Sequence, residues 1–86
     1  MTNELIDLAT KVGMALQAKR LLLATAESCT GGGVSQAVTE IAGSTGWFEC
    51  GFVTYSNVSK AEMLDVSPTL TAQFGSVSEE VAGAMA

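Results

Sequence analysis

A polar, glycine-rich turn follows the apolar run Leu21–Leu23, and its residue types suit attack on a carbonyl group. Glu27–Thr30 supplies a carboxylate, two hydroxyls and a thiol, and Gly31–Gly33 follows directly. Apolar residues then recur with helical spacing at Val34, Ala37, Val38 and Ile41. The turn is therefore predicted to join a buried strand to a helix. There the hydroxyl of Ser28 could attack a carbonyl carbon, and unpaired amides at the start of the helix could hold the oxyanion.

The same turn also has a purely structural interpretation. Ser28 or Thr30 could serve only as the N-cap of the following helix, and Gly31–Gly33 could form a tight turn. Two nucleotide-binding patterns do not fit the segment. It lacks the lysine that follows the glycines of a P-loop, and it lacks the glycine spacing of the dinucleotide fingerprint.

The chain contains no histidine, so serine–histidine and cysteine–histidine pairs cannot form within it. A hydroxyl nucleophile would then need a lysine or a carboxylate as its base. Lys11 and Lys19 fall on the polar side or at the end of a predicted first helix. Lys60 follows a second predicted strand, and parallel pairing of the two strands would bring it to the same sheet edge as Ser28. Burial would favour its neutral, basic form, although spacing alone favours a surface lysine.

Other residues near this pair have more than one interpretation. Tyr55 is either a core aromatic whose hydroxyl reaches the rim or a hydrogen-bond donor in the site. Glu27 could orient the turn or a lysine. Cys29 is expected as a small buried hydrophobe rather than a nucleophile. The pair Trp47–Phe48 is expected in the core.

Composition limits the class of protein. A chain of 86 residues is at most one small domain, and a charged fraction of 15% predicts that a neighbouring subunit or further chain covers part of its surface. The net charge of −5, with only four Lys and Arg residues, argues against a nucleic-acid partner. No apolar run reaches the roughly 18 residues of a membrane span. We expect no membrane partner.

The cysteines and the first residues predict a cytoplasmic protein. Glu4 and Asp7 interrupt the N-terminal segment, which therefore does not resemble a signal peptide. Cys29 and Cys50 are expected to be reduced and unbridged. Two cysteines without a histidine do not make a standard zinc site, so no metal ligands are predicted.

The elements that position these residues follow from hydrophobic periodicity. Thr2 or Asn3 is predicted to begin a first helix, which ends near Lys19. Its apolar stripe is predicted to pack in the core and consists of Leu5, Leu8, Val12, Ala15 and Leu16. The second helix is expected to reach about Ala42. A second strand is expected over Cys50–Tyr55, with Gly51 marking close packing of backbone or ligand.

The last third of the sequence predicts further helices. Ser56-Asn57 can cap a helix that runs through Leu64, and Pro68 ends that segment or starts the next. Ser76 or Ser78 can cap a last helix that begins at Glu79 and has no C-cap, which predicts that the parent chain continues. The order helix–strand–helix–strand–helix–helix predicts an α/β fold with helices packed on a sheet. Two strands alone are marginal, so we expect the rest of the sheet from a longer chain or another subunit.

Four blocks of the sequence resemble the CinA C-terminal domain family of competence/damage-inducible proteins, in the same order. They are TAESCTGG at Thr25–Gly32, GSTGWF at Gly43–Phe48, GFVTYSN at Gly51–Asn57 with Lys60 three residues further, and GSVSEEVA at Gly75–Ala82. The resemblance covers nearly the whole chain. It implies a three-layer α/β/α sandwich, of which residues 1–86 would be the N-terminal half.

The resemblance also implies a function. The family's activity is hydrolysis of the carboxamide of nicotinamide mononucleotide, which gives nicotinic acid mononucleotide and ammonia without a metal or cofactor. Ser28 would be the nucleophile, Lys60 its base and Tyr55 an assisting residue. The oxyanion and substrate-binding residues would be Thr30, Gly31, Gly32, Glu27 and Asn57. We expect a small-molecule nucleotide as substrate and a homo-oligomer as the assembly.

The chain departs from the family pattern in two respects. Gly33 replaces the larger apolar residue expected after the paired glycines. The second half of the family domain, with further strands and a glycine-rich segment at the nucleotide site, is not in this sequence. Two other functions therefore stand beside the amidase: a nucleotide-binding or regulatory module without turnover, and a structural half-domain that assembles with a partner.

Overall fold

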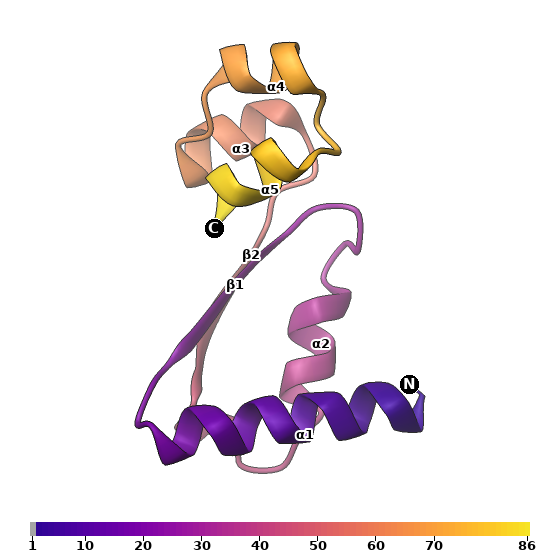
Figure 1. Ribbon diagram of the computed structural model, residues 1–86, viewed down its shortest axis with the longest axis vertical. Coiled ribbons are helices and arrows are strands. Elements are labelled where there is room, and N and C mark those ends of the chain that lie inside the picture. Colours follow the sequence, from indigo (N-terminus) through magenta and orange to yellow (C-terminus); the bar gives the residue numbers. More distant parts are fainter. Residues whose placement is uncertain (1) are drawn as a thin grey trace.

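The computed structural model describes residues 2–86, and its elements alternate between helix and strand as an α/β protein (Figure 1). The elements are α1 (Asn3–Ala18), β1 (Leu23–Glu27), α2 (Gly33–Thr39), the 3₁₀ helix η1 (Ser44–Gly46), β2 (Phe48–Val53), α3 (Asn57–Leu64), α4 (Pro68–Phe74) and α5 (Glu79–Met85). None of the helices within residues 2–86 is long and apolar enough to cross a membrane. The predicted α/β class is confirmed.

The two strands pair in parallel, which is the condition under which the sequence places Lys60 near Ser28. Leu23 pairs with Phe48 at one end and Glu27 pairs with Val53 at the other, with a register irregularity just after Leu23. Parallel pairing brings the carboxyl ends of both strands to the same end of the sheet. The polar turn after β1 and helix α3 after β2 therefore start from the same end.

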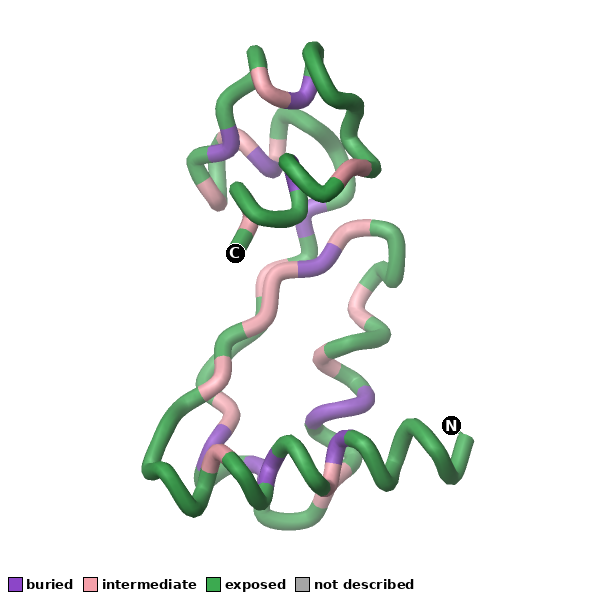
Figure 2. Tube along the Cα trace, viewed as in Figure 1, coloured by how far each residue is buried: buried purple, intermediate pink, exposed green. Residues whose placement is uncertain are grey.

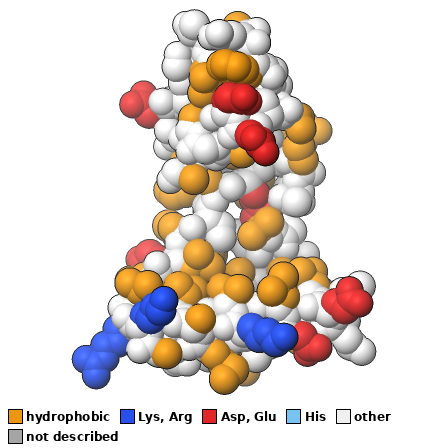
Figure 3. Space-filling model, viewed as in Figure 1, with side chains coloured by type: hydrophobic (Ala, Val, Ile, Leu, Met, Phe, Trp, Pro, Cys, Tyr) orange, Lys and Arg blue, Asp and Glu red, His pale blue; other side chains and the backbone are white. Residues whose placement is uncertain are grey.

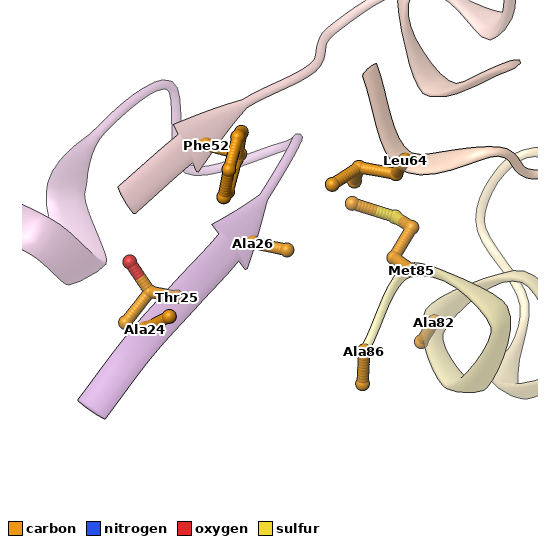
Figure 4. Close-up of a pocket in the computed structure, with 8 residues that line it drawn as sticks. All are labelled: Ala24, Thr25, Ala26, Phe52, Leu64, Ala82, Met85 and Ala86. Carbon is orange, nitrogen blue, oxygen red and sulfur yellow. The ribbon is translucent and has the colours of Figure 1, made fainter. Parts of the chain in front are cut away.

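Helix α2 packs on one face of the small sheet, and α3 and α5 contribute residues to a cavity on the other. On one face Thr25 of β1 and Ser35 of α2 share a hydrogen bond of 2.9 Å between their hydroxyls. On the other face Phe52 lies across a cavity of about 240 Å³ from Leu64 and Met85 (Figure 4). In Figure 1, α1 crosses the amino ends of the strands, and α3–α5 gather beyond their carboxyl ends.

Two glycines are needed for close packing. A Cβ at Gly51 would collide with the hydroxyls of Thr25 and Ser35, which confirms the predicted close approach within β2. A Cβ at Gly13 would lie 2.5 Å from a ring atom of Trp47. Because Gly13 has no side chain, the Trp47 ring packs directly on α1 and is buried, as expected. Phe48 is only half-buried and begins β2.

The apolar stripe of α1 is not core, and the prediction that it packs there is wrong. Its members Leu5, Leu8 and Val12 are exposed, and the buried residues of α1 are Ala9 and Gly13 (Figure 2). No segment within residues 2–86 covers this side of the helix. These exposed residues also line an apolar groove between α1, α2 and β1.

Several predicted boundaries shift in the structure. Thr2 caps α1, and Ser56 caps α3 by accepting a hydrogen bond from the Ser59 amide at 3.0 Å. Pro68 begins a separate helix, α4, which periodicity did not predict. Ser78, not Ser76, caps α5. Helix α2 ends at Thr39, and β2 begins at Phe48 and ends at Val53, earlier than predicted.

Candidate active site

The hydroxyl of Ser28 and the amine of Lys60 meet at one acceptor, the backbone carbonyl of Tyr55. Ser28 Oγ donates to that oxygen at 3.4 Å, and Lys60 Nζ donates to it at 3.1 Å. The hydroxyl and the amine therefore lie near one another on the same acceptor, and no hydrogen bond joins them directly. The parallel strands thus bring together the two groups that the sequence singled out, although they lie on different elements.

Lys60 is buried, so its interpretation as a surface lysine is wrong. Its side chain is 1% exposed, and the residue lies in the first half of α3. The capped start of α3 fixes the backbone from which the side chain reaches back to the carbonyl of Tyr55. A lysine amine held out of bulk water that shares an acceptor with a hydroxyl is a candidate base for that hydroxyl.

Tyr55 contributes through its backbone, and its interpretation as a core aromatic is wrong. The residue is 74% exposed, and its carbonyl oxygen is the group that holds Ser28 and Lys60. Asn57 is the exposed first residue of α3 rather than its cap. Both residues are exposed, and neither lines the cavity beside the turn.

Glu27 is a buried carboxylate that holds the whole turn. It is 5% exposed and accepts hydrogen bonds from the Thr30 hydroxyl at 2.6 Å and the Gly32 amide at 3.0 Å. It also accepts from the Val34 amide at 2.9 Å and from the amide and hydroxyl of Ser35, each at 3.0 Å. The carboxylate therefore occupies the positive end of α2.

The pKa of Glu27 reflects these contacts. Burial raises the pKa, but the hydrogen bonds from Thr30, Val34 and Ser35 outweigh it and lower the value from 4.5 to about 2. The carboxylate is thus ionised across the neutral range. A permanently charged group saturated with donors orients the turn, and it is poorly suited to exchanging protons.

The amides at the start of α2 are not free, which corrects the prediction of an open anion site there. Glu27 occupies the amides of Gly32, Val34 and Ser35, and the Gly31 amide donates to the carbonyl of Ser28 at 3.0 Å. The N-cap is Gly32, with a φ of 112°, so neither Ser28 nor Thr30 caps the helix.

Three amides of the turn stay available. Within residues 2–86, the amides of Ser28, Cys29 and Thr30 donate to no acceptor. Of the oxyanion donors that the sequence predicts, this leaves the Thr30 amide free. A Cβ at Gly33 would meet only Thr30, at 3.7 Å, so the glycine at that position is not required by packing.

A cavity of about 250 Å³ opens beside the turn. Its lining residues are Ala26, Glu27, Ser28, Cys29, Thr30, Ser76, Val77, Ser78, Ala82 and Met85. Cys29 is exposed, so its expected role as a buried hydrophobe is wrong. The wall that faces the turn comes from Ser76–Ser78 and α5, which the sequence did not predict as part of a site. The only signal for it was the GSVSEEVA block.

Thr54 is a buried residue of the site that the sequence reasoning missed. It is fully buried between β2 and Tyr55, and its amide donates to the Glu27 carbonyl at 3.0 Å. Its hydroxyl has no hydrogen-bond partner among the described residues. No sequence signal distinguishes it from an ordinary strand threonine. Within residues 2–86, no group of three His, Cys, Asp or Glu side chains could hold a metal ion.

A protein family and several curated proteins match this chain in sequence. The profile of the family described as "CinA C-terminal domain" matches residues 5–86. The nicotinamide-nucleotide amidohydrolase PncC of Escherichia coli K12 is 54% identical over 84 residues, which are 98% of this chain and 51% of that relative. The protein of the same name from Pseudomonas putida is 50% identical over 83 residues, 96% of this chain and 52% of the relative.

Solved structures agree in fold over the whole chain. The competence/damage-inducible protein CihA of Agrobacterium tumefaciens superposes with a TM-score of 0.96 at 41% identity, covering 100% of this chain and 52% of that one. A CinA superfamily protein of Escherichia coli superposes with a TM-score of 0.93 at 33% identity, covering 100% and 51%. The chain spans about half the length of the curated relatives it matches.

Proposed function

Because the chain belongs to the CinA C-terminal domain family, we propose that it carries the nucleophile and base of a nicotinamide-nucleotide amidase. The reaction is hydrolysis of the carboxamide of nicotinamide mononucleotide to nicotinic acid mononucleotide and ammonia. The observation that supports this most is the convergence of Ser28 Oγ and Lys60 Nζ on the Tyr55 carbonyl. Relatives at 50–54% identity named nicotinamide-nucleotide amidohydrolase support the choice of substrate.

The proposed mechanism has two steps. Ser28 Oγ attacks the carboxamide carbon while the Lys60 amine takes the hydroxyl proton. The tetrahedral intermediate collapses, the C–N bond breaks, and Lys60 passes the proton to the departing ammonia. Water then attacks the resulting ester of Ser28, Lys60 acts again as base and acid, and the carboxylate product leaves with the serine hydroxyl restored. The Thr30 amide is the donor available to the oxyanion.

In this mechanism Glu27 is a positioning residue. Its hydrogen bonds to the Thr30 hydroxyl and the Gly32 amide hold the turn that presents Ser28. The Gly31 amide could join the oxyanion hole only by leaving the Ser28 carbonyl. Tyr55 and Asn57 have exposed side chains and are assigned to contacts with the substrate at the mouth of the site.

The cavity beside the turn is proposed to receive the pyridine ring. Its lining combines polar residues of the turn, Ser28 and Thr30, with the apolar residues Val77 and Met85. A flat ring with a polar carboxamide matches that division. No Lys or Arg lines the cavity, so the substrate's phosphate must find its donors elsewhere.

The surroundings of the reaction are proposed from the same reasoning. We infer a small-molecule nucleotide substrate and a cytoplasmic setting in which Cys29 and Cys50 stay reduced. We also infer assembly into a homo-oligomer, because large apolar side chains such as Leu8 remain exposed.

A regulatory module that binds the nucleotide without turnover is the second candidate. The engaged Gly31 and Gly32 amides favour it, because two of the three predicted oxyanion donors already have acceptors within the turn. Binding without ammonia release would distinguish this function from the amidase.

The test is a chimera in which residues 1–86 replace the matched 51% of the E. coli relative. The chimera should release ammonia from nicotinamide mononucleotide, Ser28→Ala should abolish the release, and Cys29→Ala should retain it. A folded chimera that is thermally stabilised by the nucleotide but releases no ammonia would contradict the amidase and support the regulatory module.

A further inference from the structure

Two hydroxyls connect strand β1 to the Glu27 carboxylate. Thr25 Oγ1 and Ser35 Oγ lie 2.9 Å apart, and Ser35 Oγ donates to Glu27 Oε2 at 3.0 Å. An ionised carboxylate can only accept hydrogen bonds, so the single hydroxyl proton of Ser35 is used on Glu27. The hydrogen bond between the two hydroxyls therefore has Thr25 as its donor. The three side chains form one directed chain of hydrogen bonds, from Thr25 through Ser35 to Glu27.

Gly51 provides the space that the two hydroxyls need. It lies opposite Thr25 in the strand register, and a Cβ there would collide with the Ser35 hydroxyl and lie 2.7 Å from Thr25 Oγ1. In the close-up, the Thr25 oxygen points away from Leu64 and Met85, which line the cavity on the other face (Figure 4). The two hydroxyls thus meet on the face of the sheet that α2 covers.

The hydroxyl chain acts on one oxygen of the carboxylate. Glu27 Oε1 accepts from three donors of the turn and helix start, namely the Thr30 hydroxyl and the amides of Gly32 and Val34. Within residues 2–86, Glu27 Oε2 accepts only from the amide and hydroxyl of Ser35. All of these donors are neutral, and the Lys and Arg side chains on the face shown in Figure 3 lie toward α1, at the other end of β1. Hydrogen bonds therefore orient the carboxylate, and Ser35 sets the position of Oε2.

This orientation reaches the proposed reacting groups through Thr30. The Thr30 hydroxyl donates to Glu27 at 2.6 Å, its amide is free to hold an oxyanion, and Ser28 lies between the two residues in the sequence. We propose that Thr25 and Ser35 are positioning residues for the amidase, because their hydroxyls hold Glu27 in the orientation that presents Ser28 and the Thr30 amide to the substrate. This inference rests on the proposed function. The competing explanation is that the two hydroxyls only pack α2 against β1.

The experiment measures kcat and KM for ammonia release by the chimera with the E. coli relative. Ser35→Ala removes one donor to Glu27, and Thr25→Val removes the donor to Ser35 with little change in shape. We expect kcat to fall about tenfold in Ser35→Ala and about threefold in Thr25→Val, with KM within about twofold, because misplaced groups slow the chemistry without weakening binding. Thr25→Ser keeps the hydroxyl and should restore the rate. Because Thr25 acts through Ser35, the double variant should be no slower than Ser35→Ala alone.

Thr39→Val is the matched control on α2. The exposed Thr39 hydroxyl donates to the carbonyls of Ser35 and Gln36 in its own helix, at 2.9 Å and 3.2 Å, and not to Glu27. This substitution should leave kcat and KM unchanged.

Hydrogen exchange of the chimera gives a second readout that needs no turnover. The amides of Gly32 and Val34, which Glu27 holds, should exchange about tenfold faster in Ser35→Ala and at the wild-type rate in Thr39→Val. If the wild-type chimera releases no ammonia, the amidase fails, and the exchange of these amides decides whether the hydroxyls hold the turn. Unchanged exchange in Ser35→Ala would contradict the proposal whether or not the chimera is active.

Three kinetic results would also overturn the proposal. The first is a kcat of Ser35→Ala that matches the wild type or the Thr39→Val control, because the hydroxyls would then only pack the helix. The second is a Thr25→Ser variant as slow as Thr25→Val, because the hydroxyl would then not be the group that matters. The third is a double variant in which the losses at Thr25 and Ser35 multiply, because the two residues would then act separately.

Discussion

The two ends of β1 differ in how completely this chain satisfies them. At the carboxyl end, Glu27 accepts hydrogen bonds from four residues of its own turn and helix, and Ser28 and Lys60 share a carbonyl. At the amino end, Leu23 faces an apolar groove that nothing within residues 2–86 fills. The polar turn is held by local contacts, whereas the groove has apolar residues that no contact within residues 2–86 covers. The geometry of the turn can therefore form from contacts within this chain.

The largest effect is expected at Lys60 and tests the chemical half of this comparison. In the chimera, Lys60→Ala should lower kcat about 1,000-fold or more, because the serine loses its base. Lys60→Arg should be nearly as damaging, since arginine keeps the charge but cannot take a proton at neutral pH. Steady-state ammonia release gives both values. If Lys60→Arg kept most of the rate, the role of the lysine would be charge alone.

Glu27→Ala tests whether the polar turn is held locally. The substitution leaves the amides of Gly32, Val34 and Ser35 without their acceptor, and the free energy of unfolding should fall by about 3 kcal/mol. Urea denaturation of the 86-residue chain measures the loss. Glu40→Ala, at an exposed residue after α2, is the matched control and should change stability little. Equal effects of the two substitutions would show that the carboxylate does not hold the turn.

The dependence of stability on acidic pH tests the same hydrogen bonds of Glu27. The pKa of Glu27 is lowered from 4.5 to about 2, so its contribution is complete above pH 4.5 and is lost as the pH falls toward 2. The stability advantage of the wild type over Glu27→Gln should therefore shrink across that range. Unfolding curves of both proteins at pH values from about 6 to about 2 measure the difference. An advantage that stays constant with pH would contradict the charged hydrogen-bond network.

The smallest effect is expected at Thr54, whose buried hydroxyl has no partner among the described residues. Thr54→Val should raise the free energy of unfolding by about 1 kcal/mol, because the unpaired hydroxyl gives way to a methyl group of the same shape. Thr71 is the matched control: its buried hydroxyl donates to the Pro68 carbonyl at 2.9 Å, so Thr71→Val should destabilise the chain. A loss at Thr54 as large as that at Thr71 would mean that Thr54 does have a partner.

The sequence predicts the two strands and the turn because those depend on local periodicity and glycine, whereas the direction in which the strands pair entered only as a condition. It also singled out Ser28 and Lys60, but the burial of Lys60 depends on how α3 packs, and spacing does not encode that packing. The shared Tyr55 carbonyl was not predictable because backbone atoms carry no sequence signal. For Glu27 the sequence left two roles open, orienting the turn or a lysine, and its hydrogen bonds show that it orients the turn. The sequence could not decide between them because N-cap patterns look to Ser, Thr, Asp or Asn at the cap, not to a carboxylate on the preceding strand. The exposed stripe of α1 was assigned to the core because periodicity reveals an apolar face and not what covers it.

The most direct test of the central claim is to stop the chimera during turnover of nicotinamide mononucleotide and search for the acyl-enzyme by peptide mass spectrometry. The account predicts a nicotinic acid mononucleotide ester on Ser28, lost in Ser28→Ala and kept in Cys29→Ala. It also predicts that the ester appears within the first turnover. An adduct on Cys29 instead, or undiminished ammonia release from Ser28→Ala, would contradict the claim that Ser28 is the nucleophile.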